Sequence, residues 1–182
     1  LRQQFPTALL ILAPRHPRRF DAVAELVAAS GLPWSRRSQL ETAGVPAGGV
    51  WLLDSLGELA TLYRYADVAF IGGSLAPHGG HNLLEPAYFG APVVFGPEMQ
   101  NFARIAEEFL AAKAAFRAES EVELERILLR LLADDRLRAA TGQAARALLQ
   151  SQTGATERVL EAVGSALGVV PVAAALAARP EA

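Results

Sequence analysis

The chain has 182 residues, of which 52% are hydrophobic and 20% charged, and this composition predicts one packed globular domain. Its formal net charge of −2, with no basic stripe interleaved with aromatic residues, argues against a nucleic-acid-binding protein. The absence of cysteine excludes disulfides, thiol nucleophiles and thiolate metal sites.

The first apolar run, Ala8–Ala13, is too short to span a membrane, and no signal-peptide cleavage pattern follows it. It ends at Pro14, and its all-apolar character predicts a strand buried on both faces of a parallel sheet. Because the chain begins at Leu1 rather than methionine and enters this strand almost at once, we expect it to be a piece of a longer protein.

Strands and helices are predicted to alternate along the rest of the chain. The further strands expected are Trp34–Ser38, Val50–Leu53, Val68–Ile71, Pro92–Phe95 and an edge strand, Ala114–Arg117. The helices expected are Asp21–Ala29, Gly57–Tyr65, a short one ending at Gly90, Asn101–Ala111, and Glu121 to about Leu167 with breaks near Asp134-Asp135 and Ser151–Gly154. A polar connection containing Gly and Pro is expected at Gln39–Gly49. We therefore assign residues 1–167 to one domain and residues 168–182 to a loosely held tail.

This alternation indicates βαβ units and a parallel sheet with right-handed crossovers. Ligands of such sheets bind in the crevice beyond the carboxyl ends of the strands. Four loops directly follow a predicted strand and are expected to meet at that rim: Pro14-Arg15, Asp54–Gly57, Gly72–Asn82 and Gly96–Asn101.

The stretch Phe70–Phe102 combines two apolar strands with a loop that is rich in glycine and polar residues. Gly72-Gly73 and Gly79-Gly80 permit positive φ and a close approach of the backbone to a ligand. Loop amides that lead into a helix favour an anion such as a phosphate. The alternative is that the glycines only form tight turns, but the added polar side chains favour a site: Ser74, His78, His81 and Asn82.

Asn82 and Glu85 stand three residues apart and would share one face of a helix. A capping box is the alternative interpretation, but Pro86 would then occupy the fourth helical position, where its ring clashes with a carbonyl. A helix that begins nearer Leu84 accommodates Pro86 better. It would leave the carboxylate of Glu85 at the helix mouth, able to accept hydrogen bonds from two ribose hydroxyls.

For the other charged residues of the expected rim, a binding role must be weighed against a purely structural one. Arg15 follows the first strand and is suited to bidentate binding of phosphate or carboxylate, whereas Arg18 and Arg19 fit solvated charges. Glu58 can favour the dipole of its helix, or the backbone amides of Glu58 and Leu59 can read the edge of a base.

His16 can serve in the site or simply pack, and the sequence leaves both open. The pair His78 and His81 suggests a metal site, but two glycines lie between them and no third ligand has suitable spacing. We therefore expect hydrogen bonding to an anion, and no metal.

Three ordered blocks of this chain resemble a known family. They read LAPRHPRRF from Leu12, DSLGELATLYRYADVAFIGGS from Asp54, and GGSLAPHGGHNLLEPAYFGAPVVFGPEMQNF from Gly72. The last resembles the signature of bacterial 3-deoxy-D-manno-octulosonic acid (Kdo) transferases, glycosyltransferases of the GT-B fold that build the inner core of lipopolysaccharide. The resemblance implies an α/β fold with a Rossmann-like parallel sheet flanked by helices, the C-terminal donor-binding domain of such an enzyme.

The resemblance also implies a set of site residues for the donor, CMP-Kdo. Pro14 and Arg15 would contact the CMP, and Gly57, Glu58 and Leu59 would line the nucleotide. The block Asn82, Leu83, Leu84 and Glu85 would hold phosphate and ribose. The anion site would be shaped by Gly73, Ser74, Gly79, Gly80 and His81.

By the same resemblance, the acceptor is a lipid A precursor at the cytoplasmic face of the bacterial inner membrane. The family's general base is a carboxylate of an N-terminal acceptor domain, for which this chain has no counterpart, so these residues alone are expected to bind donor without transferring sugar. No cofactor is implied. The alternatives are half of another GT-B UDP-sugar transferase or epimerase, or a non-catalytic sugar-nucleotide-binding module.

Overall fold

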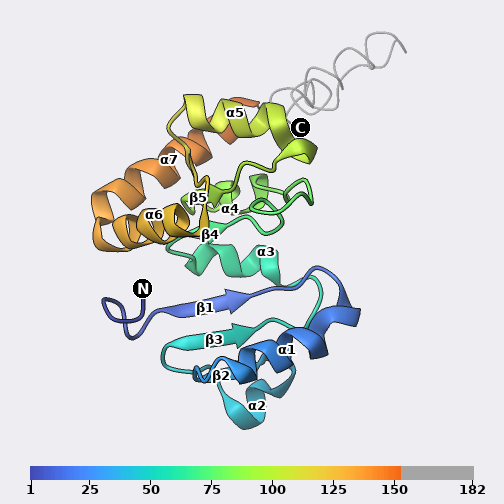
Figure 1. Ribbon diagram of the computed structural model, residues 1–182. Helices are drawn as coiled ribbons and strands as arrows, with labels where there is room; N and C mark the ends of the chain where they lie inside the picture. The colour runs from blue at the N-terminus through green and yellow to red at the C-terminus, as the bar shows by residue number, and fades with distance from the viewer. Residues whose placement is uncertain (153–182) are drawn as a thin grey trace, which may run out of the picture.

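The computed structural model describes residues 1–152, whose strands form two parallel three-stranded sheets (Figure 1). The first sheet has the order β1-β3-β2, and the second has the order β4-β5-β6. All six predicted strands are present, and every pairing is parallel. The single sheet expected from the sequence is thus divided into two halves. The strands are β1 (Leu9–Leu12), β2 (Trp34–Arg36), β3 (Gly49–Leu52), β4 (Ala69–Phe70), β5 (Val93–Phe95) and β6 (Ala115–Arg117).

Helices connect the strands and cover the sheets. They are α1 (Phe20–Ala29), α2 (Leu40–Ala43), α3 (Leu59–Leu62), α4 (Leu84–Tyr88), α5 (Ala103–Ala111), α6 (Glu121–Ala133) and α7 (Asp135–Gln152). Single 3-10 turns adjoin four of them: η1 (Pro17–Arg19), η2 (Arg37–Gln39), η3 (Tyr63–Tyr65) and η4 (Gln100–Phe102). None of the helices in residues 1–152 is long and apolar enough to cross a membrane.

Side chains that accept hydrogen bonds from backbone amides explain where α6 and α7 begin. The hydroxyl of Ser120 accepts a bond of 3.2 Å from the amide of Glu123 and caps α6. Asp134 has extended backbone angles, and its carboxylate accepts a bond of 2.9 Å from the amide of Leu137. The predicted break near Asp134-Asp135 is therefore confirmed. The expected helix beyond Gln152, the second break and the tail from Gly168 lie outside the described residues.

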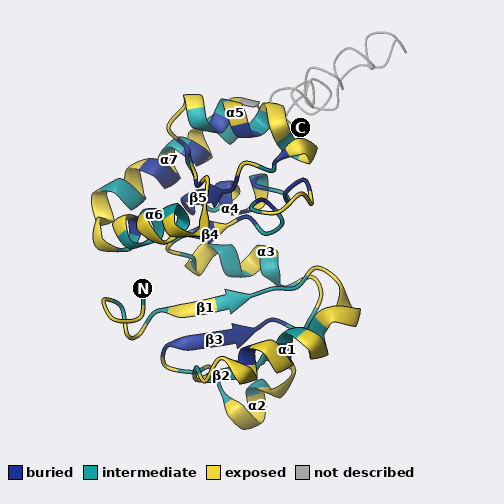
Figure 2. Cartoon of the chain, viewed as in Figure 1, coloured by how far each residue is buried: buried dark blue, intermediate teal, exposed yellow. Residues whose placement is uncertain are grey.

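Two sequence predictions are wrong in the first half of the chain. The strand at Ala8–Ala13 is not buried on both faces, since Leu9 is 36% and Leu10 55% exposed. The reason is that β1 is an edge strand, and within residues 1–152 it pairs only with β3. Figure 2 shows this contrast between a partly exposed β1 and a buried β3. The polar connection predicted at Gln39–Gly49 contains a short helix, α2, and its last residue begins β3.

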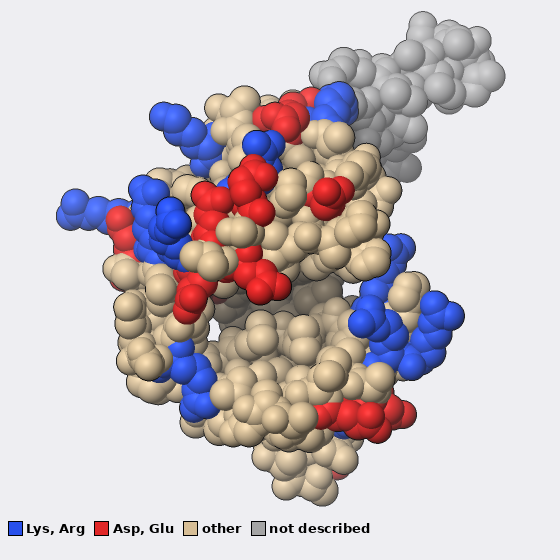
Figure 3. Space-filling view, viewed as in Figure 1, with Lys and Arg blue, Asp and Glu red and all other residues tan. Residues whose placement is uncertain are grey.

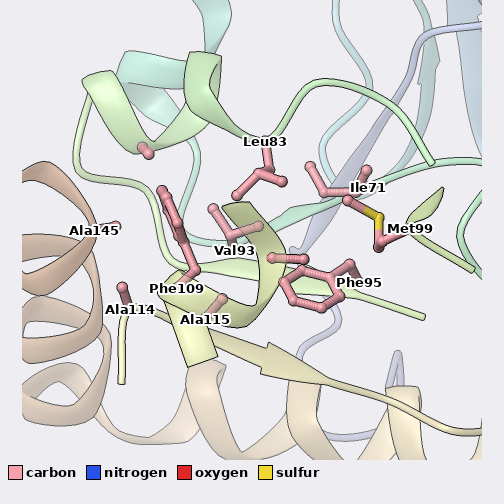
Figure 4. Close-up of a cluster of buried hydrophobic side chains, with 11 residues drawn as sticks. Ile71, Leu83, Val93, Phe95, Met99, Phe109, Ala114, Ala115 and Ala145 are labelled. Carbon is pink, nitrogen blue, oxygen red and sulfur yellow. The ribbon is translucent and has the colours of Figure 1, made fainter. Parts of the chain in front are cut away.

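The main core surrounds β5, the central strand of the second sheet. Val93, Val94 and Phe95 are almost fully buried because β4 and β6 flank this strand and helices cover it. Figure 4 shows the side chains of Phe95 and Phe109 in one cluster with residues of several other elements. That cluster consists of Ile71, Leu83, Ala87, Val93, Phe95, Met99, Ala106, Phe109, Ala114, Ala115 and Ala145.

The long helix α7 contacts the turn after α4 at a point where two glycines meet. A Cβ atom on Gly142 would overlap the carbonyl oxygen of Gly90 and lie 2.9 Å from its carbonyl carbon. Both atoms belong to the backbone, so neither can move away as a flexible side chain would. The helix therefore depends on glycine here to come close to the turn that leads into β5.

We predict that Gly142→Ala lowers the free energy of unfolding by about 1–3 kcal/mol, because the added methyl group overpacks this contact. The sign is informative, since alanine in place of glycine normally stabilises a helix interior by about 0.5–1 kcal/mol. Urea unfolding measures the change. Gln143→Ala, at an exposed position of the same helix, is the matched control and should leave stability nearly unchanged. A stabilised Gly142→Ala variant would contradict the close contact.

Candidate functional site

The loops that follow β1, β3 and β4 lie on the same side of the molecule (Figure 1), although β4 belongs to a different sheet from β1 and β3. In the space-filling view the molecule is hollowed between its two halves, and Lys and Arg side chains gather at one flank of this hollow (Figure 3). They occupy the place of the segment that follows β1, which carries Arg15, Arg18 and Arg19. The predicted rim therefore exists, and one part of it is basic.

The glycine-rich loop is closed by its own backbone. Gly73, Gly79 and Gly80 all have positive φ, and the amide of Gly80 donates a bond of 3.0 Å to the carbonyl of Gly73. Asn101 holds the loop from outside, because its amide donates to Gly79 at 3.0 Å and its side chain to Gly80 at 3.3 Å. A Cβ on Gly79 would lie 2.5 Å from the side-chain nitrogen of Asn101. Turn formation and close packing thus explain much of the glycine content, and the sequence had not singled out Asn101.

Ser74 ties the loop to the neighbouring strand and does not face the rim. It is fully buried, its hydroxyl donates a bond of 2.5 Å to the carbonyl of Ile71, and it accepts a bond of 2.7 Å from the amide of Gly96. The sequence assigned Ser74 to the anion site, but its hydroxyl binds only backbone groups here. Ser74 can therefore influence that site only by holding the loop backbone.

His81 lies in a positively charged environment beside the first glycine pair. A Cβ on Gly72 would be 3.4 Å from its Nδ1 atom, so the imidazole packs directly against the loop backbone. Burial, followed by the positive charges of Arg15, His16 and His78, lowers the pKa of His81 below its ordinary value of 6.5. These four basic side chains come from two separate loops and lie close enough to interact, and His16 is one of them. We call them the basic group. Within residues 1–152 no group of three or more histidine, aspartate or glutamate side chains that could hold a metal ion is formed.

The helix α4 begins at Leu84, as the position of Pro86 led us to expect. Pro86 is then its third residue and needs no intrahelical hydrogen bond. Asn82 retains part of a capping role, because its side-chain oxygen accepts a bond of 3.0 Å from the amide of Leu84. Its side-chain nitrogen donates a bond of 3.0 Å to Oε1 of Glu85. The carboxylate of Glu85 is therefore oriented by Asn82 and remains exposed at the helix mouth.

Tyr63 is a further residue near Glu85 that the sequence did not indicate. Burial, and then the negative charge of Glu85, raises the pKa of Tyr63 to about 12. An open groove of about 420 Å³ adjoins Glu85, with Leu84 and Tyr88 from α4 and Leu149 from α7 in its walls. Leu83 faces the opposite way and is fully buried in the main core, so its side chain cannot touch a ligand.

The loop after β3 is held by hydrogen bonds rather than by close packing. The carboxylate of Glu58 accepts bonds from Ser55 and, at 2.8 Å, from Arg37. These two partners, in that order, lower the pKa of Glu58 below its ordinary value. Its side chain thus faces other protein groups, while Leu59 begins α3 and Gly57, at φ +84°, has open space where a Cβ would be.

No protein-family model matches the chain. Curated relatives include the 3-deoxy-D-manno-octulosonic acid transferase of Bordetella pertussis, which is 43% identical over 163 residues, covering 90% of this chain and 38% of that protein. The transferase of the same name from Haemophilus influenzae is 38% identical over 159 residues, covering 87% and 37%. The chain thus spans less than two fifths of the length of these relatives.

A solved structure covers the same part of the chain. It is the C-terminal CMP-Kdo binding domain of WaaA from Acinetobacter baumannii, which is 31% identical and superimposes with a TM-score of 0.72. The match includes 82% of this chain and 94% of that domain. The likeness therefore extends over nearly the whole of a domain that has been crystallised separately.

We predict that replacing Arg15 by glutamine raises the pKa of His81 towards 6.5, since one positive charge that disfavours the imidazolium is removed. Burial of the ring is unchanged, so the pKa should remain below that value. An NMR titration of the His81 ring proton between about pH 4 and pH 8 measures the shift. Arg104→Gln, on an exposed face of α5, is the control and should leave the titration unchanged. Identical curves for Arg15→Gln and the parent chain would show that the two side chains are not neighbours.

Proposed function

This chain belongs to the 3-deoxy-D-manno-octulosonic acid transferase family, and we propose that it is the part of such an enzyme that binds the sugar donor, CMP-Kdo. The observation that carries the proposal is the basic group of Arg15, His16, His78 and His81 on the same rim as the oriented carboxylate of Glu85. A nucleotide-activated acidic sugar offers anionic groups to the first and ribose hydroxyls to the second.

The basic group is proposed to hold the phosphate of CMP. Arg15 is exposed and able to present two parallel N–H donors to an anion. The lowered pKa of His81 favours the neutral imidazole, which can still donate one hydrogen bond. An arriving phosphate would raise that pKa by favouring the imidazolium. The backbone of Gly73, Gly79 and Gly80 allows the phosphate to come close to the loop.

Glu85 is proposed to accept hydrogen bonds from the two ribose hydroxyls. The residue is exposed, and Asn82 orients one of its carboxylate oxygens. On the other side of the rim, Pro14 and the segment Gly57, Glu58 and Leu59 are proposed to line the nucleotide through their backbones. The side chain of Leu84 lies on the groove beside Glu85.

The transfer step requires groups that we place outside these 182 residues. In the proposed reaction a carboxylate base takes the proton of an acceptor hydroxyl, whose oxygen bonds to the anomeric carbon of Kdo. The bond from that carbon to the phosphate oxygen breaks, and CMP leaves with the electron pair. Arg15 and the loop amides would stabilise the negative charge on the departing phosphate. The acceptor, a lipid A precursor, and contact with the cytoplasmic face of the inner membrane are proposed for the whole enzyme.

The first test of this function is calorimetric titration of the 182-residue chain with CMP and with UMP. We expect CMP to bind and UMP to bind more weakly, because cytosine and uracil differ at the base edge that the backbone after β3 would read. No detectable binding of CMP would refute the assignment. A clear preference for UMP would point to a UDP-sugar enzyme instead.

We further predict that Glu85→Gln weakens CMP binding by about one to two decades, as expected for the loss of charge-assisted hydrogen bonds. Asn82 would still find a side-chain oxygen to donate to, so the start of α4 should be preserved. Glu25→Gln, at an exposed position of α1, supplies a control that removes the same charge elsewhere. Equal affinities for Glu85→Gln and Glu25→Gln would exclude a contact between Glu85 and the nucleotide.

A further inference from the structure

Two carboxylates, Asp54 and Glu58, stand at the ends of the loop that follows β3. Both bind the segment at the end of β2, Arg36-Arg37-Ser38, to which the sequence assigned no function. This segment and the loop lie at the carboxyl ends of neighbouring strands, since β2 pairs with β3.

Asp54 forms the first of the two connections. Its carboxylate accepts bonds from the amide and the hydroxyl of Ser38, at 2.8 and 2.7 Å, and its side chain is only 5% exposed. Burial alone would raise the pKa of Asp54, but the bonds from Ser38 and the charge of Arg36 together lower it. Arg36 lies 3.8 Å from Asp54 and 2.8 Å from Asp21, so α1 is joined to the same network.

Glu58 forms the second connection. One carboxylate oxygen accepts a bond of 2.8 Å from Arg37, and the other accepts a bond from Ser55 within the loop. Both members of the ion pair are only partly exposed, at 35% for Arg37 and 38% for Glu58. Glu58 also marks the start of α3, because its carbonyl accepts bonds from the amides of Thr61 and Leu62. Arg37 thus fixes the loop at the point where it becomes a helix.

The part of the loop between these anchors faces outward. Leu56 is 68% exposed, and Gly57 has no atom within 4 Å of the position of a Cβ. A glycine in open space allows a planar ring to come close to the backbone, and the exposed leucine beside it can contact that ring. A loop of this kind binds well only if it is already ordered, since otherwise binding must supply the cost of ordering it.

We propose that Arg37 is a positioning residue for the nucleotide, which acts through Glu58 to hold residues 54–58 in the conformation that receives the base. This inference rests on the proposed binding of CMP. It assigns a role in that binding to Arg37, which does not contact the nucleotide. An ion pair at this level of exposure contributes little to folding. Its replacement should therefore affect binding more than stability.

The experiment is calorimetric titration of CMP into the 182-residue chain and its variants. Arg37→Ala is expected to bind CMP about tenfold more weakly, with a thermal unfolding midpoint close to that of the parent chain. Arg37→Lys should recover part of the affinity, because an ammonium group can still donate one bond to Glu58. Arg104→Ala removes an arginine–glutamate pair of α5 and should leave affinity unchanged.

A double-variant cycle separates positioning from direct contact. If Arg37 acts through Glu58, Glu58→Gln combined with Arg37→Ala should weaken binding no more than Arg37→Ala alone. Losses that add fully would show that Arg37 contacts the nucleotide itself and would overturn the proposal. Unchanged affinity in Arg37→Ala would overturn it as well.

A second measurement needs no ligand. Backbone ¹⁵N relaxation of Leu56, Gly57 and Glu58 in the free chain should show faster motion in Arg37→Ala than in the parent chain or Arg104→Ala. Unaltered relaxation would refute the positioning role even if the parent chain failed to bind CMP. That failure would count only against the proposed function, so the two outcomes remain distinguishable.

Discussion

The close contact between the loops after β4 and β5 is the constraint on which the rest of the site depends. A Cβ on Gly96 would lie 2.5 Å from the carbonyl carbon of Ser74, and the buried hydroxyl of Ser74 bonds to backbone on both sides of that contact. Removing this hydroxyl would leave the amide of Gly96 buried without a partner, at a cost of about 1–3 kcal/mol. The amide of Glu98 also donates to the carbonyl of Ser74, so several hydrogen bonds hold the glycine-rich loop in place.

Because the glycine-rich loop is held in place, it can keep His78 and His81 close to the basic side chains that follow β1. Burial of the ring, followed by the charges of Arg15, His16 and His78, disfavours the protonation of His81. Such a group persists only if the backbone around it is fixed by other contacts, which Asn101 and Ser74 provide. Local electrostatic conflict in a well-packed protein is typical of binding sites, where a ligand relieves it.

The sequence predicted the elements of this fold better than their environment. Periodicity and turn residues located every strand of residues 1–152, and the geometry of proline correctly placed the start of α4 at Leu84. The prediction that β1 is buried on both faces was wrong, because an all-apolar run does not reveal whether a strand has one neighbour or two. Ser74 bonds to Gly96, and Asn101 bonds to Gly80. Each pair is about twenty residues apart in the chain, so no local sequence pattern predicts these bonds.

The two walls of the candidate site are held by different kinds of contact. The wall from Gly72 to Glu85 is held by backbone hydrogen bonds and by glycines that pack where no side chain fits, and salt has little effect on either. The wall from Asp54 to Glu58 is held by carboxylates, one of them in a partly exposed ion pair with Arg37, and mobile ions screen such pairs. In the proposed complex, packing would fix the surface that faces phosphate and ribose, whereas charge would fix the surface that faces the base. Binding of the phosphate would then depend on ionic strength through direct attraction, and binding of the base would depend on it through the order of the loop from Asp54 to Glu58.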